Sequence, residues 1–216
     1  IRDCLLSRGL GDVYKRQDKI RGFITAKGKL KGEINKPEIQ INFNVDYPHY
    51  KGIRIRETWE GEIKNLNSKY VVNMKNRYSR VPSFLTFNLD SNIKLENITF
   101  SRIFNSNKGS LTLVTDGDKY RWNANNFPLD ELELAIRNNE FDRVSGIVNG
   151  SGFISKDQTY FDGRLAWSLG KYRNIKFANS LFNFTINDQS FYLNSSLYPI
   201  DGGMIDLEYD SNKYDN

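Results

Sequence analysis

Few residues of this sequence have the types and spacing that catalysis or metal binding requires. His49 is the only histidine, and it stands in a Tyr-Pro-His-Tyr turn without the serine or acid motif of a nucleophilic site. Three glutamates between residues 57 and 62 stand beside two arginines, which favours ion pairing over a pair of glycosidase acids. Asp116-Gly117-Asp118 is typical of a hairpin turn and lacks the further oxygen ligands of a calcium loop. We therefore expect no enzymatic activity, no catalytic residue, no metal site and no cofactor.

The three tryptophans could stack on nucleic-acid bases, but the charge pattern argues against that role. Trp59, Trp122 and Trp167 lie in stretches where basic residues are mixed with acids, and the net charge is only +5. A nucleic-acid groove needs clustered positive charge along one face. We interpret the tryptophans as part of an apolar floor or core, and we expect no nucleic-acid partner.

The first 17 residues differ in character from the rest. The segment Asp12-Val-Tyr-Lys-Arg-Gln17 resembles a translated sequencing adapter, so we expect residues 1–17 to be artefactual or disordered. Setting them aside removes the only cysteine, Cys4, and lowers the net charge to +3. The remaining chain has no disulfide framework and no cysteine nucleophile, and no stretch is long and apolar enough for a membrane helix.

Alternation of apolar and polar residues dominates the remainder of the chain. A period of two indicates β-strands with one buried and one solvated face. We therefore predict an all-β fold, a long antiparallel meander. The apolar residues that we expect to share one face are Ile53, Ile55, Trp59 and Ile63 in the first half, and Leu165, Trp167, Leu169, Phe191, Leu193, Leu197, Ile205 and Leu207 in the second.

One stretch departs from this alternation. Pro128 suits a first helical position, acids follow it, and Leu129, Leu132 and Ile136 have helical spacing. We predict one short helix near residues 128–138. It divides the chain into a first β repeat unit at 18–126, a helical connector at 127–140 and a second, truncated unit at 141–216.

Two sequence matches predict that these units are repeats. Gly28-Lys-Leu-Lys-Gly32 matches Gly146-Ile-Val-Asn-Gly150 as alternating glycine strands. Tyr50-Lys-Gly-Ile-Arg-Ile55 matches Tyr172-Arg-Asn-Ile-Lys-Phe177 with an offset of 122 residues (172 − 50). Long-period β repeats bury their apolar faces by stacking on their neighbours.

The order of these motifs resembles the C-terminal repeat region of the TamB family (translocation and assembly module, in the AsmA-like superfamily), in a member of cyanobacterial type. The family pattern has a Pro-Leu step, a strand bounded by glycines, a strand with a central glycine, an apolar strand and a closing Gly-Gly strand. The matching segments are Phe127-Pro128-Leu129, Gly146 to Gly150, Asp162-Gly163-Arg164-Leu165, Ile175 to Leu181 and Gly202-Gly203-Met-Ile-Asp-Leu207.

The resemblance implies a β-taco, a sheet curled lengthwise into an open trough with an apolar inner face. It implies a non-enzymatic, envelope-spanning protein that carries phospholipid between membranes and assists outer-membrane assembly with an Omp85-type partner. The full-length protein would lie in the periplasm, anchored in the inner membrane through parts missing from this chain. The residues that we expect to line the lipid groove are the twelve apolar residues named above.

Two other readings of the alternation remain open. In a β-sandwich or adhesin-like binding module, the apolar faces would meet in a dry core and the loops would carry the function. In an outer-membrane barrel, the apolar face would point outward into lipid, and aromatic residues would gather at both ends of uniform strands.

Overall fold

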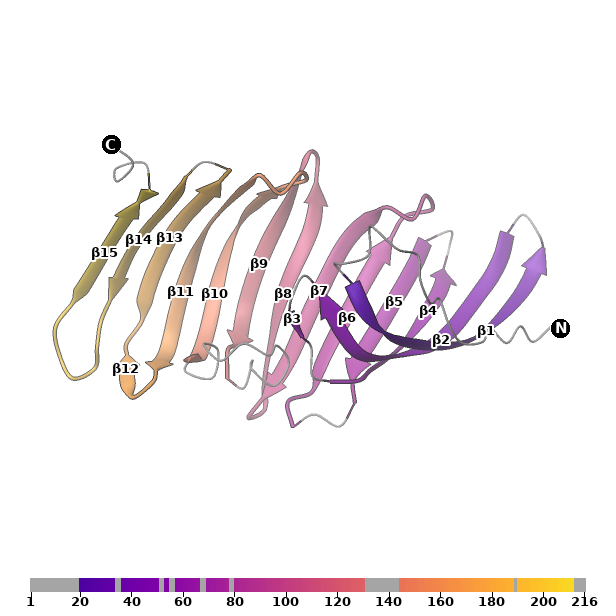
Figure 1. Ribbon diagram of the computed structural model, residues 1–216, viewed down its shortest axis with the longest axis horizontal. Coiled ribbons are helices and arrows are strands. Elements are labelled where there is room, and N and C mark those ends of the chain that lie inside the picture. The colour runs from indigo at the N-terminus through magenta and orange to yellow at the C-terminus, as the bar shows by residue number, and fades with distance from the viewer. Residues whose placement is uncertain are drawn as a thin grey trace. The chain divides into compact units, whose positions relative to one another are not determined.

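The chain forms β-strands joined by turns in the computed structural model (Figure 1). The structure describes residues 20–33, 36–50, 53–54, 57–66, 69–77, 80–130, 144–188 and 190–211. The segment 1–17, which we predicted to be artefactual or disordered, lies outside these residues. In the described part of the chain, no helix is both long and apolar enough to span a membrane.

The chain divides into two compact units. Unit 1 comprises Ile1–Ile98 and Glu131–Phe141, and unit 2 comprises Thr99–Asp130 and Asp142–Asn216, so that β7 (Leu95–Phe104) contributes to both. The other strands of unit 1 are β1 (Ile20–Glu33), β2 (Lys36–Tyr50), β3 (Ile53–Arg54), β4 (Trp59–Leu66), β5 (Lys69–Asn76) and β6 (Ser83–Leu89). The other strands of unit 2 are β8 (Asn107–Asp116), β9 (Lys119–Pro128), β10 (Val144–Ser155), β11 (Tyr160–Tyr172), β12 (Ile175–Phe177), β13 (Ser180–Asn187), β14 (Phe191–Leu197) and β15 (Ile205–Asp210).

Neighbours in sequence are neighbours in the sheet. The ladder runs β1-β2-β4-β5-β6-β7-β8-β9-β10-β11-β13-β14-β15, while β3 pairs with β2 and β12 pairs with β11. Within the described residues, β1 pairs only with β2 and β15 only with β14, so the sheet is not closed on itself. The predicted all-β antiparallel meander is therefore confirmed.

The backbone pairing shows the same 122-residue repeat as the match of Tyr50–Ile55 with Tyr172–Phe177. Tyr50 pairs with Ile53 across β2 and β3, and Tyr172 pairs with Ile175 across β11 and β12, again 122 residues apart (175 − 53). Each of the two repeats thus contains a long hairpin, β1–β2 or β10–β11, followed by a short strand that pairs back onto it. The repeated meander character of the chain is an observation of the backbone as well as of the sequence.

Both long hairpins also contain the same irregularity. In β2 the residue pair 47–48 opposes Gly22, and in β11 the pair 169–170 opposes Gly146, which makes a β-bulge in each. Tyr47 and Leu169, 122 residues apart (169 − 47), have left-handed φ values of 52° and 51°. The bulge is therefore a conformational feature that the two repeats share.

The register corrects one of the two sequence matches. Gly28 pairs with Ile41, and Gly152 pairs with Gly163, which lies 122 residues after Ile41 (163 − 41). Gly28 therefore corresponds to Gly152, and the predicted match of Gly28–Gly32 with Gly146–Gly150 is wrong by six residues (152 − 146). Glycines alternate along both strands, so the sequence pattern alone fits more than one alignment.

The predicted helix does not begin at Pro128. Pro128 is the last residue of β9, and the amide of Leu129 extends the pairing by donating to the Gly146 carbonyl at 2.8 Å. The buried Arg102 holds this strand end, because its Nη1 donates to the Pro128 carbonyl at 2.8 Å. A proline at a strand end costs little because it need not donate to the ladder. The rest of the predicted helix, residues 131–138, lies outside the described residues.

Candidate functional site

Unit 2 presents one apolar and one polar face. Directly opposed residues on neighbouring strands point to the same side of a sheet. The register therefore shows which side chains share a face. We call "apolar face" the side that holds Leu111, Leu113, Trp122, Ala124, Phe127, Val148, Ile154, Phe161, Leu165, Trp167, Phe182, Phe184, Ile186, Phe191, Leu193, Leu197, Ile205, Leu207 and Tyr209. From β8 to β15, the register places no charged side chain of the described residues on this face.

Two glycines let the indole of Trp122 lie flat on the apolar face. Its Nε1 donates to the Asp162 carbonyl at 2.8 Å. The ring of this β9 residue therefore lies across β10 and reaches β11. A Cβ atom at Gly152 would lie 2.6 Å from Trp122 Nε1, and one at Gly163 would lie 2.1 Å from its Cζ2. The indole then stacks on Phe184 of β13 with ring centroids 6.1 Å apart and planes 16° apart. Aromatic side chains thus cover the sheet backbone where the strands carry glycine.

Trp167 repeats this arrangement at the other end of the β10–β11 hairpin. Its Nε1 donates to the Ser145 carbonyl at 2.9 Å, and its ring covers Gly146 and Gly170. Phe177 packs against it with ring centroids 5.3 Å apart. Beside these rings lies a hollow of about 350 Å³ with a wholly apolar lining, formed by Leu129, Val144, Val148, Leu165, Trp167, Tyr172, Phe177, Phe182 and Leu197.

The structure brings together seven of the eight groove residues predicted in the second half. Leu165, Trp167, Phe191, Leu193, Leu197, Ile205 and Leu207 all lie on the apolar face. Leu169 does not join them. It is 76% exposed, because the bulge gives Gly170 the place beside Trp167 and turns Leu169 away. The prediction that Leu169 shares a face with Trp167 is therefore wrong.

Of the four residues predicted in the first half, the structure places two on one face of unit 1. Trp59 and Ile63 lie on the same side of β4, opposite Val45 and Ile41 of β2. Ile53 and the pair Trp59 and Ile63 belong to two different strands, β3 and β4. Ile53 belongs to β3, where only its backbone is described, and Ile55 lies outside the described residues.

Several residues of the apolar surface escaped the sequence reasoning. Phe177, Phe182 and Val148 line the hollow, and Phe161 and Phe184 pack edge to face at 5.0 Å. The sequence of β13 did contain a pattern that could have predicted Phe182 and Phe184, because its aromatic and aliphatic residues alternate with polar ones. No local sequence pattern could have predicted the role of Phe177, because its contact with Trp167 depends on the pairing of β12 with β11.

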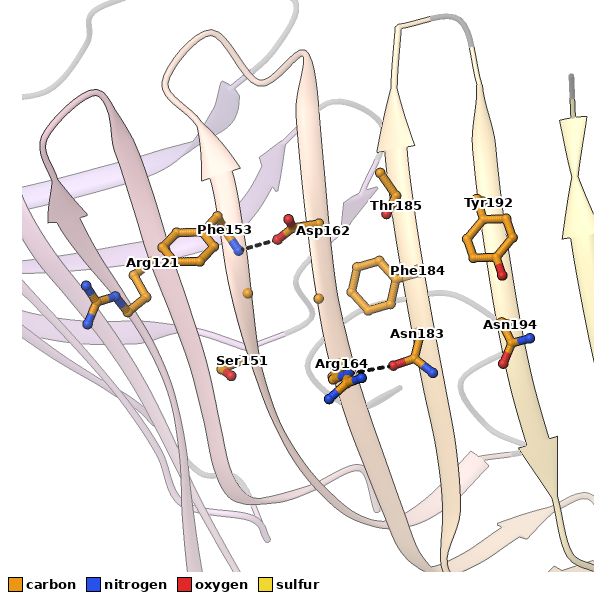
Figure 2. Close-up of a pocket in the computed structure, with 12 residues that line it drawn as sticks. Arg121, Ser151, Phe153, Asp162, Arg164, Asn183, Phe184, Thr185, Tyr192 and Asn194 are labelled. Carbon is orange, nitrogen blue, oxygen red and sulfur yellow. Dashed lines mark hydrogen bonds between the residues drawn. The ribbon is translucent and has the colours of Figure 1, made fainter.

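The opposite, polar face of unit 2 carries charged, amide and hydroxyl groups (Figure 2). Arg164 Nε donates to Asn183 Oδ1 at 2.9 Å, and the Phe153 amide donates to Asp162 Oδ1 at 2.9 Å. Tyr160 donates its hydroxyl proton to the same carboxylate at 2.9 Å, and this hydrogen bond raises the pKa of Tyr160. These polar groups satisfy one another within and between strands, so the polar face carries a network of hydrogen bonds.

The acidic residues that the sequence offered as candidates for chemistry form ion pairs, hydrogen bonds and a turn. Glu60 pairs with Lys75 at 2.9 Å across β4 and β5, and the hydrogen bond from Lys75 lowers the pKa of Glu60. Glu57 accepts a hydrogen bond from Asn76 Nδ2 at 2.6 Å. Asp116 and Gly117 form the β8–β9 turn, where Asp116 pairs with Arg121. Among the described residues, no group of three His, Cys, Asp or Glu side chains could hold a metal ion.

Comparisons of the chain with protein-family models, with curated proteins and with solved structures gave no match. Among the described residues of β9 to β15, the polar side chains that the register places on the apolar face include the hydroxyls of Tyr120, Ser180 and Ser195. What this surface can do chemically is remove hydrocarbon from water.

Proposed function

We propose that this chain is part of a non-enzymatic protein of the cell envelope that shields phospholipid acyl chains on an apolar sheet face. The observation that carries the proposal is the apolar face of β8 to β15, on which the register places no charged side chain of the described residues. Large apolar side chains at its β15 edge stay in contact with water: Ile205, Leu207 and Tyr209 are all more than two-fifths exposed. Extended exposed apolar surfaces mark sites of lipid, ligand or protein contact.

The backbone of a paired sheet suits this task. Its amide and carbonyl groups are satisfied by neighbouring strands, so an acyl chain on the apolar face meets side chains only. Each methylene that leaves water for such a surface contributes roughly 0.8 kcal/mol. The attraction therefore grows with chain length and needs no specific polar group, and the lipid headgroup can remain in water.

The resemblance to the TamB family supplies the wider setting of the proposal. We infer that the sheet curls lengthwise into a trough and that the full-length protein spans the periplasm from an inner-membrane anchor. Phospholipid then moves between the two membranes along the trough, and an Omp85-type protein is the partner at the outer membrane. These parts of the proposal rest on the resemblance, whereas acyl-chain binding rests on the apolar face.

Binding of a fluorescent phospholipid by the purified chain tests the proposal. Leu207→Glu places a charge on the apolar face where the wild-type side chain is 43% exposed, so the fold tolerates it. Because a carboxylate resists transfer from water into hydrocarbon, we expect this variant to weaken phospholipid binding about tenfold or more.

Val114→Glu is the matched control, because Val114 is also 43% exposed but lies on the polar face of β8. It should bind phospholipid like the wild type. Equal weakening by the two substitutions, or no binding by the wild type while circular dichroism reports a folded sheet, would contradict the proposal.

A further inference from the structure

The end of the β11–β12 hairpin concentrates positive charge beside the apolar hollow. Tyr172 lines the hollow, and the guanidinium of the next residue, Arg173, lies 5.4 Å from the centroid of the Tyr172 ring. Lys171 and Lys176 oppose each other directly across the two strands. We call these three cations, Lys171, Arg173 and Lys176, the cationic rim.

The cationic rim is costly for the fold by itself. Like charges directly opposite each other on paired strands destabilise a sheet. All three side chains are exposed, and none forms an ion pair with another residue in the described parts of the chain. Asp201 stands on the adjoining turn, where the amide of Ile200 donates to the Lys176 carbonyl at 3.0 Å, so the rim keeps an excess of positive charge. An anion placed among the three cations would relieve their repulsion.

The position of the rim relates it to the hollow. The register places Tyr172 and Phe177 on the apolar face and both lysines on the polar face. Arg173 lies in the turn that joins the two strands, in a left-handed conformation with φ of 53°. A group that leaves the hollow over Tyr172 therefore meets Arg173 first, and the two lysines project from the other face of the same strand end.

The other repeat carries the same arrangement in its sequence and backbone. Tyr50-Lys-Gly-Ile-Arg54 corresponds to Tyr172-Arg-Asn-Ile-Lys176. In β2 and β3 the register places His49 opposite Arg54, as Lys171 stands opposite Lys176. At the same strand end of the two repeats, a histidine thus opposes an arginine in one and a lysine opposes a lysine in the other.

We propose that the cationic rim binds the phosphate of a lipid whose acyl chain occupies the apolar hollow. This inference rests on the proposed function and assigns the residues that bind the phosphate of its lipid. The hollow, at about 350 Å³, is at the lower end of the range of roughly 300–1,000 Å³ for ligand sites, which suits one acyl chain. Arg and Lys are the side chains that bind phosphate through charge-assisted hydrogen bonds.

Two lipids that differ only in the phosphate test this assignment. Calorimetry would compare 1-myristoyl-glycerol phosphate with 1-myristoylglycerol, both below their micelle concentrations, on the full chain. We expect the phosphate-bearing lipid to bind about tenfold more tightly. In the variant Arg173→Gln/Lys176→Gln this preference should disappear, while binding of 1-myristoylglycerol stays unchanged.

The double variant Lys119→Gln/Lys156→Gln is the control for charge alone. It removes two exposed lysines at the opposite end of the β9–β10–β11 strands and should keep the preference. Equal binding of the two lipids by the wild type would overturn the rim assignment and leave acyl-chain binding standing. Failure of both lipids to bind would overturn the proposed function itself. Glycerol 3-phosphate that binds as tightly as the phosphate-bearing lipid would mean a site for free phosphate and would also overturn the assignment.

Discussion

Replacing Gly163 with valine is expected to lower the free energy of unfolding by about 3 kcal/mol. The reason is the indole of Trp122, whose Cζ2 would lie 2.1 Å from a Cβ atom at this position. The ring cannot stay over β11, so it loses both its hydrogen bond to the Asp162 carbonyl and its stacking on Phe184. Urea denaturation followed by circular dichroism measures the change.

The control for Gly163→Val is Ser151→Val in the neighbouring strand. Ser151 is exposed on the polar face, where its direct partners on the neighbouring strands are Arg164 and Asn123. Valine also favours strands, so this variant should unfold at nearly the wild-type urea concentration. Equal stability of the two variants would show that the position of Trp122 does not depend on a glycine at residue 163.

Trp167→Ala is expected to cost about 4 kcal/mol of unfolding free energy. Trp167 is buried, packs on Phe177 and Phe182, and satisfies the Ser145 carbonyl through its indole N–H. Removing it uncovers the glycine backbone on both strands and deletes one wall of the hollow. Thermal and urea unfolding of the variant report the loss.

Trp167→Phe separates the two contributions of this side chain. Phenylalanine keeps part of the aromatic packing but cannot donate to the Ser145 carbonyl, so we expect a loss of about 2 kcal/mol. If Trp167→Ala unfolded within about 1 kcal/mol of the wild type, the ring would not be the anchor that the structure assigns to it.

The period of two in the sequence was sufficient to predict the strands and most of their faces. The alternating pairs Leu165 and Trp167, Phe191 and Leu193, and Ile205 and Leu207 each stay in phase within one strand. Within a strand the direction of a side chain follows from its position alone. The all-β meander therefore followed from local patterns.

The misplaced residues are those whose position depends on a partner strand. Leu169 looked like the next member of the Trp167 face, but the bulge opposite Gly146 shifts the phase by one residue. Pro128 looked like the start of a helix, but the pairing of Leu129 with Gly146 keeps it in the ladder. Neither pairing is visible in the neighbouring residues of the sequence.

The apolar hollow and the two glycines under Trp122, Gly152 and Gly163, could not be predicted from local patterns for the same reason. Trp122 reaches Phe184 across two intervening strands, and this is possible only because Gly152 and Gly163 fall opposite each other. A sequence pattern can mark each glycine as a place of close approach. It cannot state which ring approaches until the register is known.

Photo-crosslinking at two adjacent residues tests most directly the claim that lipid lies on the apolar face. A photoreactive amino acid would replace Leu193, which faces Phe184 and Tyr209, or Tyr192, which points to the opposite face beside Thr185 and Asp210. We predict that phospholipid is captured by irradiation at position 193 and not at position 192. Equal capture at both positions, or capture at 192 alone, would contradict acyl-chain binding on the apolar face.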